Sequence, residues 1–392
     1  MTKLSKSNDA YLRGKEIAQC GDFRCILETL RKEGLLEKCI DLMQSEYNVF
    51  FASNGFKPDR TVWETLTILG LYDTPTLEHC LRTFSITRDI ATKPLLGPRG
   101  EEIILKEYIE EAGVPLPKLF LAAMVHDIGK IKLPIEILHN SLTDEEMNHL
   151  LTDMIWRGDS VEEIGIRMGY TPDELSHKTA EEIVQRMYER GMRPVAIVPL
   201  SDAFPEIKYP GFLASLEGRG LGEKQTIKSA AKVHESEGQK IFEELGDPIV
   251  ADLVGHHHNY QKKAEHEMSY IMKIPMIKSH GQEAFFGVYN IIKIADSMDS
   301  LQSERSYKKG MSKIAALAEL AHQAMTRRIE KSITYLWVNT EYSHIKDMMN
   351  TIGVSDYGQH NKAAVDTIQQ FLDEANAEFD RRYVDRLPVS VL

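Results

Sequence analysis

Apolar residues recur every three to four positions along most of this 392-residue chain, and the strict alternation that marks β-strands is almost absent. Residues 25–30, 35–43 and 227–245 show the helical spacing, and only residues 195–200 alternate like a strand. A helix with one apolar face must bury that face against other elements. The sequence therefore predicts an all-α fold.

Changes in composition divide the chain into five segments. Residues 155–224 are unusually rich in glycine and proline towards their end, which indicates an inserted subdomain with loop character. The insertion interrupts a helical core, and further helices precede and follow that core. The predicted segments are 1–70 (N-terminal helices), 71–154 (first part of the core), 155–224 (insertion), 225–330 (second part of the core) and 331–392 (C-terminal helices).

Charge and cysteine content exclude several classes of partner and compartment. The formal net charge of −12 argues against duplex nucleic acid or a membrane surface as partner, because both require a basic surface. Four cysteines without Cys-x-x-Cys spacing are most simply reduced cytoplasmic thiols. No run approaches the roughly 18 apolar residues of a membrane span. We expect a cytoplasmic protein and leave a homodimer open.

A histidine and an aspartate stand side by side after an apolar run. His126 and Asp127 follow residues 119–125 and offer one nitrogen and one oxygen ligand from a single point of backbone. Lys130 lies about one helical turn further on, so its ammonium can face the same spot. Gly129 would let a bulky ligand approach the backbone. Taken alone, such a pair is more often a polar helix end.

Further donors lie on, or at the ends of, other apolar helices. Three consecutive histidines at 256–258 are hard to explain by packing, because each buried ring needs a polar partner. Asp296 interrupts an apolar stretch and needs a cation nearby. Together these donors predict a two-metal site inside a helical bundle. The predicted ligands are His79, His126, Asp127, His234, His257, His258 and Asp296.

The sequence leaves two points open: which metal binds, and which two of the three consecutive histidines are ligands. Imidazole combined with carboxylate suits iron, manganese or zinc better than calcium or magnesium. The pair His256–His257 is an alternative to His257–His258. The remaining histidines are most simply surface or packing residues.

Several motifs, taken in order, resemble the HD-GYP branch of the HD-domain phosphohydrolases, whose members cleave cyclic di-GMP. His-Asp-Ile-Gly-Lys at 126–130 resembles the central motif of the family, and His79 fits its first ligand. Residues 252–258 resemble its helix with a His-His pair. Ile-Ala-Asp at 294–296 resembles its last ligand helix, and Ser-Glu-Arg-Ser-Tyr-Lys at 303–308 is similar to its Asp-Arg-Pro-Tyr-Arg tail.

The resemblance implies a phosphodiesterase that hydrolyses cyclic di-GMP or a related cyclic dinucleotide. Two divalent transition-metal ions, iron or manganese ahead of zinc, would share a hydroxide that attacks the phosphate, and a third ion is left open. We expect Asp127 to bridge the metals and Lys130 to neutralise charge developing on the phosphate. Arg305 and Lys308 match family positions that hold the phosphates of the ligand.

Three features differ from the family pattern, and two other functions stay open. The N-terminal region shows no recognisable sensor domain. Asn-Tyr-Gln-Lys at 259–262 stands where the family has a glutamate and a Gly-Tyr-Pro loop, and the insertion at 155–224 separates motifs that normally lie close together. The ligands also suit an HD-type di-iron oxygenase. A non-catalytic nucleotide-binding signalling module is the other alternative, although such a module would be expected to lose ligands.

Overall fold

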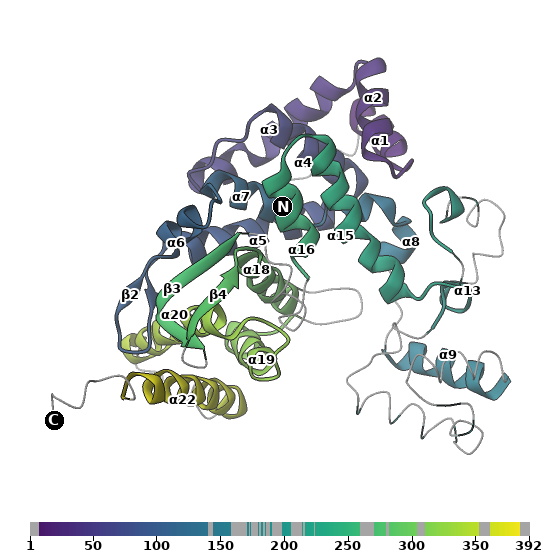
Figure 1. Cartoon of the computed structure of the whole chain (residues 1–392). Coiled ribbons are helices and arrows are strands. Elements are labelled where there is room, and N and C mark those ends of the chain that lie inside the picture. Colours follow the sequence, from purple (N-terminus) through teal and green to yellow (C-terminus); the bar gives the residue numbers. More distant parts are fainter. Residues whose placement is uncertain are drawn as a thin grey trace.

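The computed structural model describes residues 8–139, 144–157, 198–204, 216–222, 224–258, 270–279, 282–303, 310–352 and 361–384, together with single positions between 171 and 214. Helices dominate these residues, so the predicted all-α class is confirmed (Figure 1). Within the described part of the chain, no helix is both long and apolar enough to cross a membrane.

Four helices precede the core. The fourth, α4, packs against the other three and against the core. Every residue from 65 to 72 is buried, because α1 to α3 pack on one side of α4 and the core packs on another. This all-round burial explains why the apolar run in this helix shows no polar face. The four helices are α1 (Asp9–Ala18), α2 (Phe23–Lys32), α3 (Leu36–Ser53) and α4 (Arg60–Tyr72).

The core consists of helices that are distant in sequence and adjacent in space. Helix α5 packs against both α7 and α18, while α15 packs against α16 and the 3₁₀ turn η1. Asp73 begins α5 by accepting a hydrogen bond from the backbone N–H of Thr76 at 3.0 Å. The core elements are α5 (Thr74–Thr92), α7 (Leu116–Val125), η1 (Ile128–Lys132), α15 (Ile227–Glu244), α16 (Pro248–His256) and α18 (Tyr289–Gln302).

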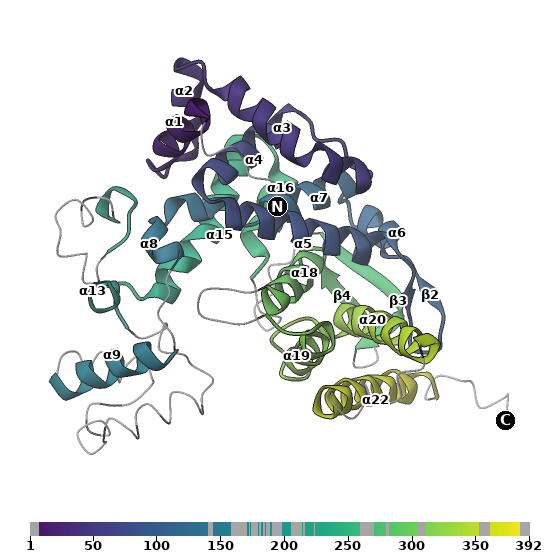
Figure 2. The same cartoon turned by 180° about the vertical axis from the view of Figure 1, so that it is seen from behind.

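Further helices follow or interrupt this core in the sequence. The C-terminal helices pack against one another and reach the core through α18 (Figure 2). These are α19 (Lys313–Met325), α20 (Lys331–Ile352) and α22 (Lys362–Val384). The other helices are α6 (Leu105–Glu111), α8 (Ile135–Leu138), α9 (Asp144–Arg157) and α13 (Leu200–Ala203). The segment boundaries expected from the sequence stay a prediction.

Two small hairpins were not predicted. Strands β3 (Ile271–Ser279) and β4 (Gln282–Gly287) pair antiparallel, and the register shifts between Lys273 and Lys278. Pro275 lies inside this irregular stretch and lacks the N–H that a regular ladder needs. Strands β1 (Leu95–Leu96) and β2 (Glu102–Ile103) form the second hairpin.

The strand expected at 195–200 is not observed in the residues that the structure describes. Pro199 forms an isolated bridge with Thr226, and Leu200 begins helix α13. Residues 195–197 lie outside the described ranges.

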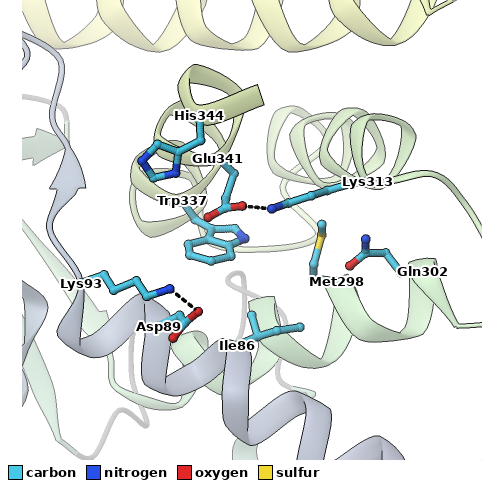
Figure 3. Close-up of a pocket in the computed structure, with 9 residues that line it drawn as sticks. All are labelled: Ile86, Asp89, Lys93, Met298, Gln302, Lys313, Trp337, Glu341 and His344. Atoms are coloured by element: carbon cyan, nitrogen blue, oxygen red, sulfur yellow. Dashed lines mark hydrogen bonds and ion pairs between the residues drawn. The ribbon is translucent and has the colours of Figure 1, made fainter. Parts of the chain in front are cut away.

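A cavity of about 340 Å³ lies where α5 and α18 meet α19 and α20 (Figure 3). Both lysines that line it are paired with carboxylates: Lys93 lies 2.7 Å from Asp89, and Lys313 contacts Glu341. Because each carboxylate neutralises the lysine beside it, the cavity offers no unpaired lysine among its described lining residues to bind a phosphate. None of the site residues predicted from the sequence lines it.

Candidate metal centre

The structure brings all seven predicted metal ligands into one region between the core helices. Helix α5 supplies one histidine, the junction of α7 and η1 supplies the His-Asp pair, and α15, the end of α16 and α18 supply the others. Most of these side chains are buried, as expected for donors on apolar helix faces. The residues are His79, His126, Asp127, His234, His257, His258 and Asp296.

The first group of donors combines two histidines with two aspartates. The Nε2 atom of His79 lies 3.0 Å from Asp296 Oδ1 and 3.6 Å from Asp127 Oδ2. The Nε2 atom of His126 lies 3.5 Å from the same oxygen of Asp127 and 3.9 Å from Asp296 Oδ1. Two nitrogens and two carboxylate oxygens therefore face a common point.

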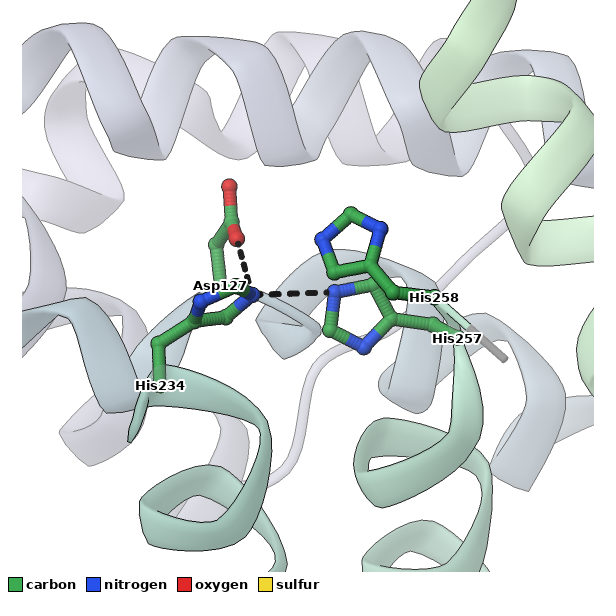
Figure 4. Close-up of side chains that lie close together, drawn as sticks. All are labelled: Asp127, His234, His257 and His258. Atoms are coloured by element: carbon green, nitrogen blue, oxygen red, sulfur yellow. Dashed lines mark hydrogen bonds and ion pairs between the residues drawn. The ribbon is translucent and has the colours of Figure 1, made fainter. Parts of the chain in front are cut away.

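The second group combines three histidines with the other oxygen of Asp127 (Figure 4). The Nε2 atom of His234 lies 3.5 Å from Asp127 Oδ1 and 3.3 Å from His257 Nε2. The ring of His258 lies beside both, with centroids 5.1 Å from His234 and 4.0 Å from His257. Asp127 thus presents Oδ2 to the first group and Oδ1 to the second.

Three of the histidines are oriented by the same contact, in which Nδ1 faces the backbone carbonyl three residues earlier. His126 Nδ1 lies 2.9 Å from the carbonyl of Ala123, three residues earlier in the chain. His257 Nδ1 lies 2.5 Å from the carbonyl of Val254, and His234 Nδ1 contacts the carbonyl three residues before it. A carbonyl oxygen only accepts, so each Nδ1 carries the hydrogen and each Nε2 keeps a lone pair. The lone pairs point into the two groups, which is the orientation of metal-binding histidines.

This geometry leaves buried lone pairs that a bound cation would satisfy. The Nε2 atom of His126 is buried and has no hydrogen-bond partner. The Nε2 atoms of His234 and His257 face each other without a hydrogen between them. Burial lowers the pKa of His234 to about 4 and that of His257 well below its usual range, so both rings are neutral at pH 7. The two groups therefore fit divalent-metal binding.

His256 lies outside both groups, which distinguishes the two ligand pairs considered, His256–His257 and His257–His258. Its Nδ1 lies 2.8 Å from the carbonyl of Asp252, and its ring lies 6.1 Å from that of Tyr289. The side chain of His258, which faces the second group, is 40% exposed. The geometry thus favours His257–His258 as the ligand pair, and the centre reaches solvent beside His258.

Lys130 lies at the shared carboxylate. Its Nζ is 2.5 Å from Asp127 Oδ2, and its side chain is partly exposed. Burial opposes ionisation of Asp127, but Lys130 and the neighbouring histidines hold the pKa of this carboxyl well below its usual range. The predicted substrate-binding residues Arg305 and Lys308 lie outside the described ranges.

The expected role of Gly129 is wrong. A Cβ at this position would overlap the carbonyl oxygen of His234 and lie 2.7 Å from the backbone nitrogen of Gly238. The missing side chain therefore allows η1 to pack directly on α15, not a ligand to approach. This contact sets the distance between Asp127, next to η1, and His234 on α15.

Two charged residues near the centre were missed in the sequence. Arg82 lies one helical turn after His79, and its Nε donates to Asp299 Oδ1 at 2.7 Å. Lys293 lies one turn before Asp296, and its burial lowers the pKa of its ammonium to about 8 against the opposing effect of Asp296 and Glu235. The sequence could have indicated both residues, because each lies one helical turn from a predicted ligand.

The family comparison agrees with this geometry. Residues 76–204 match the model of the HD domain. The chain contains an HD domain. The match includes His79, His126 and Asp127. The other four predicted ligands lie after residue 204 in the sequence, and the fold brings them next to the matched three. Searches of curated proteins and of solved structures found no match.

Proposed function

We propose that this HD-domain protein is a metal-dependent phosphodiesterase acting on cyclic di-GMP or a related cyclic dinucleotide. The observation that carries the proposal is the division of the two oxygens of Asp127 between the two donor groups. A carboxylate in this position suits a pair of neighbouring divalent ions, the usual arrangement for phosphate-ester hydrolysis.

Each donor group would hold one ion. His79, His126 and Asp296 would hold the first, His234, His257 and His258 the second, and Asp127 both. When bound, the ions lower the pKa of water and polarise the phosphate oxygens. The surrounding protein orients these ligands through backbone carbonyls and keeps three imidazoles neutral by burial.

Cationic side chains would bind the substrate phosphate. Lys130 lies at the edge of the first group, where the ammonium of this partly exposed side chain can approach a phosphate oxygen. Because Asp127 Oδ2 also faces His79 and His126, an ion held by this group would draw the oxygen away from Lys130, whose ammonium would then be available to a substrate phosphate. Arg305 and Lys308 would hold further phosphate oxygens, the arginine in bidentate fashion.

Sequence features support the HD-GYP assignment and a cyclic dinucleotide as substrate. The motifs at 126–130, 294–296 and 303–308 follow the order of that family, while 259–262 lacks its Gly-Tyr-Pro loop. The acidic net charge of −12 makes a small nucleotide a better partner than duplex nucleic acid. We propose iron or manganese as the bound metal.

A hydrolysis screen tests this function. Metal-free protein is loaded anaerobically with Fe²⁺ or with Mn²⁺ and incubated with cyclic di-GMP, its linear dinucleotide, mononucleotides and bis(p-nitrophenyl) phosphate, with oxygen uptake recorded in parallel. We expect hydrolysis of a cyclic dinucleotide by wild type and a loss of at least about a thousandfold in Asp127→Ala, because both ions lose a ligand. Asp41→Ala, an exposed carboxylate on α3, is the matched control.

Each alternative function has its own outcome in this screen. Oxygen uptake without phosphate release would identify an HD-type di-iron oxygenase. Tight nucleotide binding without turnover in the metal-loaded protein would indicate a signalling module. Full turnover in Asp127→Ala would contradict the proposed mechanism.

A further inference from the structure

His79 differs from the other oriented histidines in the partner of its Nδ1 atom. His126, His234 and His257 contact carbonyls of their own helices, but His79 Nδ1 lies 2.6 Å from the carboxylate oxygen Oδ2 of Asp299 on α18. A carboxylate held against the outer nitrogen of a metal-binding histidine fixes the ring and raises its basicity. Asp299 can hold the His79 ring in place only if its own carboxylate is held in place.

Arg82 fixes that carboxylate. Its Nε donates to Asp299 Oδ1 at 2.7 Å and its Nη2 donates to Oδ2 at 3.1 Å, so the two groups form a bidentate pair. The Asp299 side chain is 6% exposed, whereas that of Arg82 is 47% exposed. A nearly buried carboxylate is thus oriented by a guanidinium that reaches it from the surface.

Ser303 adds a third contact at the same point. Its Oγ donates to Asp299 Oδ2 at 3.1 Å and accepts from Arg82 Nη2 at 3.2 Å. Ser303 is the C-terminal cap of α18. Arg82 on α5 therefore holds both the carboxylate and the end of the helix that carries Asp296.

We propose that Arg82 is a positioning residue of the metal centre, which acts through Asp299 to hold His79 in its ligating orientation. This inference rests on the proposed metal centre but not on any substrate. Arg82 itself contacts none of the seven ligands in the described structure. Its substitution should therefore weaken the ion bound by His79 and leave the ion bound by His234 and His257 unaffected.

Metal affinity measured by competition with a chromophoric chelator tests this role. We expect Arg82→Gln to weaken the binding of one Mn²⁺ ion by about tenfold and to leave the other unchanged, as is typical for loss of an outer partner of a ligand histidine. Arg82→Lys, which keeps the charge without the bidentate contact, should lie between Arg82→Gln and wild type. Arg88→Gln is the matched control, because Arg88 lies on the same helix and pairs with Asp89.

A double variant separates positioning from general destabilisation. If Arg82 acts through Asp299, Arg82→Gln combined with Asp299→Asn should weaken the ion no further than Asp299→Asn alone. Activity lost in Arg82→Gln should return at higher Mn²⁺ concentration. Equal weakening of both ions, additive losses in the double variant, or an unchanged affinity would each overturn the proposal. A wild type that binds two ions and hydrolyses no phosphate would refute the proposed function and leave this inference intact.

Discussion

The Nε2 atoms of His234 and His257 lie 3.3 Å apart, and neither nitrogen carries a hydrogen, because the Nδ1 of each ring donates to a backbone carbonyl. Two lone pairs at this distance repel each other, and a cation bound between them would remove this repulsion. The pair therefore accounts for the burial of His257, the C-terminal cap of helix α16, next to His234.

His257→Ala should remove one of these lone pairs and weaken the binding of one ion by at least about tenfold. Its neighbour provides the control. His256→Ala should leave both ions in place, since His256 Nδ1 lies on the carbonyl of Asp252 and its ring lies outside the centre. Metal content after dialysis, measured by mass spectrometry, distinguishes the two. A larger loss in His256→Ala would show that the register is displaced by one residue.

Gly129→Ala should destabilise the fold, because a Cβ at this position overlaps the carbonyl oxygen of His234 and forces η1 away from α15. We expect a loss of about 1–3 kcal/mol in the free energy of unfolding, measured in urea. Gly218→Ala is the control, since a Cβ there meets no atom within 4 Å. Identical urea midpoints for Gly129→Ala and wild type would show that the close packing of η1 on α15 is not required.

Glu330 should make the stability depend on pH without any contribution from the metal centre. Its side chain is 3% exposed, and burial raises its pKa to about 7, although its carboxylate accepts hydrogen bonds from the backbone of Ser332 and Ile333. Its folded pKa lies above its ordinary value of 4.5. The folded state thus prefers the protonated form, and this stability is present below about pH 4.5 and lost as the pH rises through about 7.

The variant Glu330→Gln isolates this effect, because it stays neutral at every pH. Between pH 4.5 and pH 8, wild type should lose about 3 kcal/mol of unfolding free energy relative to this variant. Glu374→Gln, at an exposed position on α22, should follow wild type throughout. Parallel pH profiles for wild type and Glu330→Gln would show that the pKa of Glu330 does not change on folding.

The fold class and the set of donors could be predicted because both depend on local pattern. Helical periodicity is visible in single segments, and a donor on an apolar face must point inward. Asp296 illustrates this: a carboxylate within an apolar helix had to find a cation or a donor, and it faces His79. The donors come from five segments, and their convergence could be predicted because the apolar face of each helix turns its donor towards the common core.

Features that depend on contacts between distant segments were not predicted. Gly129 was expected to admit a ligand, because the sequence does not show that α15 packs on it. The bond from Arg82 to Asp299 joins residues 217 positions apart. The β3–β4 hairpin lacks alternation and contains Pro275, so its pairing depends on the surrounding structure and not on propensity.

The most direct test of the two-ion centre is the metal content of wild type and Asp127→Ala, combined with anomalous diffraction from Mn²⁺-loaded crystals. We predict two ions in wild type, one on each side of Asp127: the first beside His79 and His126, the second beside His234 and His257. Asp127→Ala should lose both. A loaded wild type that shows no anomalous peak between these side chains, or an Asp127→Ala variant that retains two ions, would contradict the account.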